Sequence, residues 1–134
     1  MSEGRPQVTP FLMFEGRAEE AMNFYVSTFG DASIDAVQRY GPEGPGPEGS
    51  VFHATFTIAG QQLFCIDSPT PHAFTFTPAM SLHVTCASEA EIDARFARLS
   101  DGGAVLMPLG EYPFSRRYGW VQDRFGVSWQ LSVA

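Results

Sequence analysis

The sequence predicts an α+β fold of two consecutive β-α-β-β-β modules, at about residues 7–67 and 79–133, within a single domain of 134 residues. Three observations lead to this prediction. A shift of 72 residues superposes the first strand, helix start and helix stop of one half on those of the other without a gap. Both helical segments carry an apolar stripe and end at a glycine. Each is then followed by three segments that read as strands.

The first module begins with the strand-like segment Val8–Phe14. A helix is predicted over Arg17–Phe29, because Gly16 can cap its start and apolar residues recur at helical spacing. Gly30 is the expected stop signal. Three strands are predicted to follow, at Ser33–Tyr40, Val51–Ala59 and Gln62–Asp67.

The second module repeats these signals. Glu19 corresponds to Glu91 and Gly30 to Gly102, and Ser88 with Glu91 forms a capping box at the predicted helix start. Three strands are again predicted to follow, at Ala104–Leu109, Arg116–Gln122 and Val127–Val133.

The last predicted strand has one apolar face and one small, polar face, because Ser128, Gln130 and Ser132 alternate with apolar residues. The closing hairpin aligns with Ile58–Asp67 at an offset of 65, which pairs Gln130 with Cys65. This hairpin is therefore a candidate wall of a pocket.

Composition and charge limit the function classes. The hydrophobic fraction of 44% supplies a substantial core, and the formal charge of −7 argues against nucleic-acid or anionic-membrane partners. Met1–Gln7 contains no apolar stretch typical of an export signal, so we expect a cytoplasmic protein. Cys65 and Cys86 stand singly in strand-like segments and are expected to be buried, reduced thiols.

Each predicted sheet has one face covered by its helix and one open face, and two open faces side by side would form a trough. Alternation along the strands places a mixed set of side chains in this trough, as in many small-molecule pockets. The trough set is Thr9, Phe11, Met13, His53, Thr55, Thr57, Cys65, Asp67, Ser81, His83, Thr85, Ser128, Gln130 and Ser132. The side packed on the helices is predicted to hold Phe52, Phe56, Leu82, Val84, Cys86, Trp129 and Leu131.

Several short motifs occur along nearly the whole chain: Thr9–Phe14, Ala18–Ala21, Asn23–Tyr25, Phe29-Gly30, His53–Phe56, Phe74–Pro78, Gly119-Trp120 and Asp123–Gln130. With these motifs the chain resembles the PhnB-like family, often labelled 3-demethylubiquinone-9 3-methyltransferase-like, of the vicinal oxygen chelate superfamily. The superfamily includes glyoxalase I, extradiol dioxygenases and bleomycin- and fosfomycin-resistance proteins. The resemblance implies paired β-α-β-β-β modules, and we expect a homodimer whose paired modules form the pocket.

Metal-dependent members of this superfamily place His or Glu at four symmetric trough positions. The repeat alignment assigns those positions to Thr9, Cys65, Ser81 and Gln130, which are poor ligands for Zn²⁺, Ni²⁺ or Fe²⁺. We therefore expect no metal or other cofactor. The alternative is a displaced site in which two histidines and a carboxylate, His53, His83 and Asp67, hold the metal.

The preferred functional prediction is a protein that binds a small organic molecule in the trough. Its predicted pocket residues are Thr9, Phe11, Cys65, Asp67, Ser81, Trp120 and Gln130, and His53 or His83 would supply any acid–base step. The alternatives are a metal-dependent lyase, isomerase or dioxygenase, and a sequestration or resistance protein without catalysis. The methyltransferase label has no support from a Gly-rich nucleotide-binding turn, because prolines interrupt Gly41–Gly49 and no helix follows it.

Overall fold

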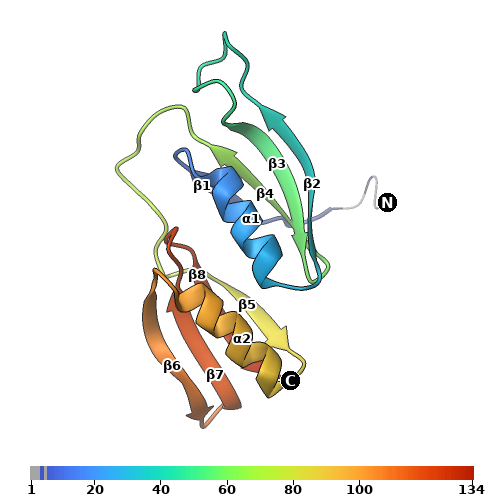
Figure 1. The fold of residues 1–134 in the computed structure, drawn as a ribbon, viewed down its shortest axis with the longest axis vertical. Coiled ribbons are helices and arrows are strands. Elements are labelled where there is room, and N and C mark those ends of the chain that lie inside the picture. The colour runs from blue at the N-terminus through green and yellow to red at the C-terminus, as the bar shows by residue number, and fades with distance from the viewer. Residues whose placement is uncertain (1–3, 5) are drawn as a thin grey trace. The chain divides into compact units, whose positions relative to one another are not determined.

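The computed structural model describes Gly4 and residues 6–134, so the prediction for Met1–Gln7 falls mostly on residues outside the described part. The chain divides into two compact units, Met1–Pro71 and His72–Ala134, and each contains one β-α-β-β-β module (Figure 1). The predicted α+β fold of two such modules is confirmed. Neither helix in the described residues is long and apolar enough to cross a membrane.

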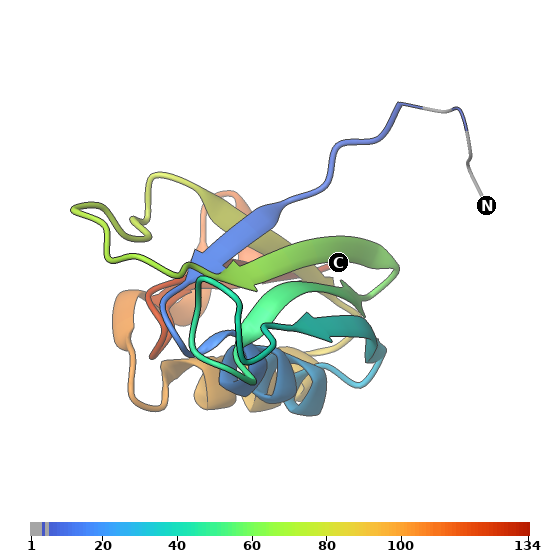
Figure 2. The ribbon, with the colours of Figure 1, turned by 90° about the horizontal axis from the view of Figure 1, so that it is seen from above.

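The N-terminal module is a four-stranded mixed sheet with one helix on one face. Its elements are β1 (Phe11–Phe14), α1 (Ala18–Thr28), β2 (Ala32–Arg39), β3 (Val51–Ile58) and β4 (Gln61–Asp67). The strand order is β1-β4-β3-β2, with β1 parallel to β4 and the other pairs antiparallel. Figure 2 shows α1, in dark blue, beneath the strands of this sheet.

The C-terminal module has the same topology. Its elements are β5 (Ser81–Cys86), α2 (Glu89–Ser100), β6 (Ala104–Tyr112), β7 (Ser115–Gln122) and β8 (Ser128–Val133). The strand order is β5-β8-β7-β6, and β5 is parallel to β8. The closing hairpin of the chain therefore supplies the central strands of this sheet.

The two helices are capped differently. The start of α1 has no side-chain cap of its own; the Asp67 carboxylate accepts hydrogen bonds from the backbone N–H groups of Gly16 and Ala18, both at 2.9 Å. In α2, Ser88 accepts a hydrogen bond from the Glu91 N–H at 3.2 Å, and the Glu91 carboxylate accepts one from the Ala87 N–H. The predicted capping box is present at the second helix.

Each module has its own core between helix and sheet. In the N-terminal module Tyr25 of α1 stacks on Phe56 of β3, and both are fully buried, as is Met22. In the C-terminal module Ile92 and Leu99 of α2 are buried with Trp129, and Trp129 is the largest fully buried side chain. Burial of side chains of this size is worth roughly 1.5–3 kcal/mol each.

The predicted orientation of Cys65 and Asp67 toward the open face is wrong, because the two closing hairpins differ in turn length. In the first, Ile58 pairs with Gln61 around a two-residue turn. In the second, the Asp123 N–H bonds to the Val127 carbonyl, which leaves three residues in the turn. A shift of one residue turns every side chain of a strand to the other face. Cys65 and Asp67 are consequently buried on the helix side, with 0% and 3% of their surface exposed.

The corrected register changes the repeat alignment. Leu12 lies beside Cys65 in the first module as Val84 lies beside Leu131 in the second. Cys65 therefore corresponds to Leu131, and the counterpart of Gln130 is Phe64.

The prediction that Phe52 packs on the helix is also wrong, since 53% of its surface is exposed. The pairing of β2 with β3 is irregular between Gln38 and Arg39, opposite the start of β3, and Val51 is buried instead. The remaining alternation in β3 is as predicted, because Ala54, Phe56 and Ile58 are buried.

Candidate functional site

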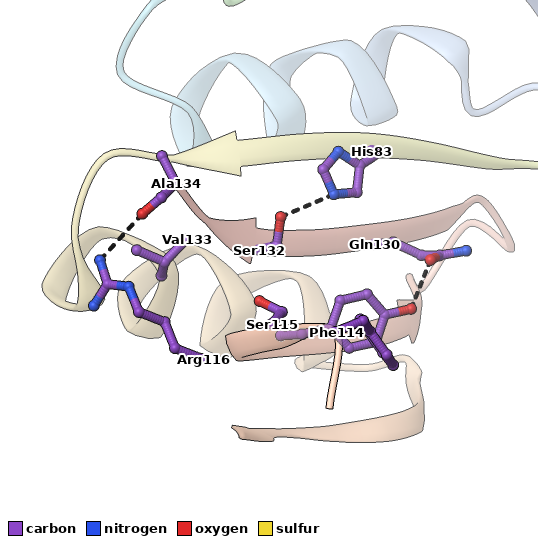
Figure 3. Close-up of a pocket in the computed structure, with 9 residues that line it drawn as sticks. His83, Phe114, Ser115, Arg116, Gln130, Ser132, Val133 and Ala134 are labelled. Atoms are coloured by element: carbon purple, nitrogen blue, oxygen red, sulfur yellow. Dashed lines mark hydrogen bonds between the residues drawn. The ribbon is translucent and has the colours of Figure 1, made fainter. Parts of the chain in front are cut away.

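A cavity of about 590 Å³ lies against the face of the C-terminal sheet that α2 does not cover (Figure 3). Most of its lining comes from β5, β7 and β8. The lining residues are His83, Phe114, Ser115, Arg116, Tyr118, Gln130, Ser132, Val133 and Ala134. Cavities of this size accommodate small organic molecules.

A continuous chain of hydrogen bonds crosses the open face of this sheet. The Tyr118 hydroxyl donates to Oε1 of Gln130 at 2.6 Å, and Nε2 of Gln130 donates to Oγ of Ser81 at 3.1 Å. Ser81 and Ser128 share a hydrogen bond of 2.7 Å between their hydroxyls, and Nε1 of Trp120 donates to Oγ of Ser128 at 2.8 Å. The strand register explains the chain, because Ser81 lies opposite Ser128 and Trp120 opposite Gln130.

His83 lies beside Gln130 in the parallel pairing of β5 with β8. Its Nε2 atom is 3.0 Å from Oγ of Ser132, and either atom can be the donor, depending on the tautomer (Figure 3). The ring is exposed to solvent. An imidazole held in place by a serine hydroxyl and open to the cavity can donate a proton to a bound molecule or accept one from it.

An aromatic cluster closes one side of the cavity. The ring of Phe114 lies edge-on to Tyr118, with centroids 4.9 Å apart, and stacks on Tyr112 at 5.6 Å. Burial, with a smaller contribution from the nearby Tyr112, raises the pKa of Tyr118 above its usual value. Tyr118 therefore remains a neutral hydrogen-bond donor at physiological pH.

Asp123 fixes the turn that precedes β8. One oxygen of its carboxylate accepts hydrogen bonds from the backbone N–H groups of Phe125 and Val127, and the other accepts one from Nε1 of Trp129 at 2.8 Å. This carboxylate is buried, with 4% of its surface exposed. It holds the three-residue turn in one conformation and so sets which residues of β8 face the cavity.

The open face of the N-terminal module is apolar by comparison. His53 lies among the rings of Phe11 and Phe64, with centroid distances of 5.7 Å and 5.2 Å. Phe11 is more than half exposed. Thr9 is half-buried just before β1.

The structure divides the predicted site residues into three groups. Ser81, His83, Trp120 and Gln130 lie together on the open face of the C-terminal module. Thr9, Phe11 and His53 belong to the N-terminal module. Cys65 and Asp67 are in the interior, and burial together with the Asp67 carboxylate raises the pKa of Cys65 to about 12. The side chains of Cys65 and His53 are on opposite faces of the sheet.

Sequence reasoning left Phe114 and Ser115 out of the site, although both line the cavity. They lie at the β6–β7 turn, where the strand alternation is interrupted, so their direction had no sequence signal. For Tyr118 a sequence signal existed: it is two residues from Trp120 on the same strand, so both side chains lie on the same face.

The described side chains do not form a metal centre at the four symmetric positions or at the displaced site. Within Gly4 and residues 6–134, no three His, Cys, Asp or Glu side chains gather closely enough to hold a metal ion. The displaced site of His53, His83 and Asp67 is contradicted, because Asp67 is on the helix side of its sheet and both its oxygens accept backbone hydrogen bonds. The corrected register also replaces Cys65 with Phe64 among the symmetric positions.

Comparison with known proteins places these features in a family. Residues 6–132 match the family model described as 3-demethylubiquinone-9 3-methyltransferase. The uncharacterized protein Mb0911c of Mycobacterium bovis is 32% identical over 94% of this chain and 82% of its own length.

Among solved structures, a PhnB protein from Bacillus cereus has 60% identity and a TM-score of 0.93, over 96% of this chain and all of that chain. The fosfomycin resistance protein FosX from Listeria monocytogenes has only 14% identity and a TM-score of 0.67, over 97% and 93% of the two chains, so it shares the fold. The chain belongs to the PhnB-like, 3-demethylubiquinone-9 3-methyltransferase family.

Proposed function

We propose that this protein binds a small organic molecule in the cavity on the open face of its C-terminal module. The observation that carries this proposal is the hydrogen-bonded chain from Tyr118 through Gln130 to Ser81, on a sheet face that could otherwise be apolar. Polar side chains held in fixed orientations beside aromatic rings are the usual composition of a small-molecule site.

Within this proposal each side chain has a role. Gln130, held in place by Ser81, contacts polar groups of the ligand, and Phe114 contacts its apolar part. His83 is the candidate for an acid–base step, because its ring is exposed and its Nε2 atom is oriented by Ser132. The proposal also includes assembly of the chain as a homodimer.

The test is a fragment screen by NMR with an isotope-labelled chain. Ligands of this site are expected to shift the resonances of His83, Tyr118 and Gln130 and to leave those of Phe11 and His53 in place. The Gln130→Ala variant should bind such a fragment about tenfold more weakly, since one or two hydrogen bonds are lost. If no fragment shifts the cavity resonances, the proposed function is wrong.

His83→Ala separates an enzyme from a binding protein. In an enzyme that uses His83 as an acid or base, this variant retains ligand affinity and loses turnover by roughly 10²–10⁴-fold. In a sequestration protein the variant and the parent are equally inactive against every bound ligand. Light scattering at two protein concentrations tests the homodimer.

A further inference from the structure

The ligand chemistry of this same cavity follows from a count of polar hydrogens, and the inference therefore rests on the proposed function. The hydrogen-bonded chain Trp120–Ser128–Ser81–Gln130–Tyr118 contains six polar hydrogens: one indole N–H, three hydroxyls and the two of the amide. Its four hydrogen bonds use only four of them. Two donors in this chain therefore have no acceptor among the described residues.

This surplus does not depend on how the Gln130 amide is oriented. As described, Nε2 donates to Ser81 and keeps one spare N–H. With the amide turned over, Nε2 would donate to the Tyr118 hydroxyl and would again keep one spare N–H. In both cases Gln130 presents an unused donor, and a second one remains on a hydroxyl of the chain.

His83 and Ser132 add to the surplus. With a neutral imidazole the pair has two polar hydrogens and one hydrogen bond between Nε2 and Oγ. One donor is again left over, on either His83 or Ser132, and His83 lies opposite Gln130 in the pairing of β5 with β8. Unpaired donors are more costly to bury than unpaired acceptor lone pairs, so a ligand that covers this face has to bring acceptors.

The charge distribution favours an anionic acceptor over a neutral one. The protein has 15 acidic residues and a net charge of −7, yet no Asp or Glu side chain lines the described cavity. The cationic side chain of Arg116 does line it. This guanidinium pairs with Glu89 at 3.2 Å and donates to the Ala134 carbonyl at 3.2 Å, but both contacts are exposed and the ion pair is therefore weak.

The aromatic cluster defines the other part of the ligand. Phe114 is 65% exposed although it stacks on Tyr112 and contacts the edge of Tyr118. An exposed ring at the rim of a cavity is available to pack on a second ring. We infer that the cavity binds a ring-bearing organic acid, whose oxyanion accepts hydrogen bonds from Gln130 and its neighbours and whose ring packs on Phe114.

The test compares three probes of the same shape: phenylacetate, the neutral phenylacetamide and the cationic phenethylamine. Binding is followed by NMR titration at constant ionic strength. Phenylacetate is expected to bind at least about tenfold more tightly than phenethylamine, with phenylacetamide between them, since charge-assisted hydrogen bonds are the stronger ones. Titration of the resonances of His83, Tyr118 and Gln130 should give this same order of affinities for the three probes.

The decisive variant is Gln130→Glu, which keeps the side-chain size and replaces the two amide N–H donors, of which one is spare, with an anionic acceptor. This variant should bind phenylacetate about tenfold more weakly than the parent protein does, and it should no longer prefer phenylacetate to phenethylamine. The matched control is Gln62→Glu, which adds the same charge at an exposed position of the N-terminal module and should leave the preference unchanged. If Gln130→Glu does not fold, Gln130→Ala replaces it and should also lose the preference.

Two outcomes would overturn the inference. Binding of phenethylamine as tight as that of phenylacetate in the parent protein contradicts an organic-acid site while leaving a small-molecule site in place. An equal effect of Gln130→Glu and Gln62→Glu shows that only overall charge matters. If none of the three probes nor any screened fragment shifts a cavity resonance, the proposed function fails as well.

Discussion

Tyr118 of β7 donates a hydrogen bond of 2.6 Å to Oε1 of Gln130 on the neighbouring strand β8. Tyr118 lies directly opposite Ser132, so this contact is a diagonal one across the antiparallel pair. The Tyr118 residue is buried, and Gln130 is also held by Ser81 on its other side. The amide is thus fixed at both ends before any ligand arrives.

Removal of this hydroxyl in Tyr118→Phe should lower the free energy of unfolding by about 1 kcal/mol, the usual net value of one buried hydrogen bond. The Gln130 side-chain amide resonances should broaden or shift, because the amide loses one of its two partners. Urea denaturation and NMR measure the two effects. In the control, Tyr112→Phe, an exposed hydroxyl loses its bond to the Pro108 carbonyl, and a change below about 0.5 kcal/mol is expected.

Asp67→Asn should be strongly destabilising. The carboxylate accepts three backbone N–H groups, from Gly16, Ala18 and Val51, whereas an amide would direct its own N–H₂ at one or two of these donors. The expected loss is about 2–4 kcal/mol in the free energy of unfolding. Denaturant unfolding measures it.

The control for this prediction is Asp35→Asn. Asp35 is exposed and accepts hydrogen bonds from the hydroxyls of Ser33 and Thr57, which can rotate to suit an amide. Its substitution should cost less than about 0.5 kcal/mol. Equal losses for the two variants would contradict the capping role of Asp67.

The buried thiol of Cys65 should make the protein less stable at high pH. Its pKa is raised from 9.0 to about 12 by burial and then by Asp67. Between these two pH values the unfolded chain has released this proton while the native protein keeps it. The unfolded state then binds fewer protons, so the free energy of unfolding falls as pH rises, by at most about 1.4 kcal/mol per pH unit.

This dependence is measured by urea unfolding between pH 8 and pH 10.5. Cys65→Ala should have a shallower decline with pH than the parent protein, whatever its stability at neutral pH. The buried thiol of Cys86, whose pKa is also raised by burial, remains in this variant and accounts for part of the residual slope. Identical slopes would show that Cys65 does not titrate differently in the two states.

Gly119→Ala tests the packing of α2 on β7. A methyl group on Gly119 would overlap the ring of Phe96, so substitution should cost about 1–3 kcal/mol. The second substitution Phe96→Leu should recover part of this loss in a double-mutant cycle, because it removes the ring that clashes. Gly110→Ala is the control, since nothing lies within 4 Å of a Cβ at that strand position.

The repeat and the local signals within each module were readable from the sequence, because they depend on neighbouring residues. Ser88 and Glu91 are three positions apart and form the predicted capping box. The alternation in β8 correctly placed Gln130 on one face and Leu131 on the other. Such features can be predicted without knowing how the strands pair.

The faces of Cys65 and Asp67 could not be inferred from a constant offset, because a single extra turn residue reverses the face of every residue after it. One signal was available: the turn glycines Gly60 and Gly126 both have positive φ and are 66 positions apart, not 65. Alignment on these glycines gives the register that the structure has. The helix cap from Asp67 had no such signal, since donor and acceptor are 49 residues apart in the case of Ala18.

The two helices therefore differ in when their caps become available. As the chain is synthesised from its N-terminus, Ser88 emerges before α2 and can cap it at once. The N-terminus of α1 must wait for Asp67, 49 residues beyond Ala18, and so for β4 to be made and to pair. Although the modules share one topology, the cap of the C-terminal helix is local to that helix, whereas the cap of the N-terminal helix is completed only together with its sheet.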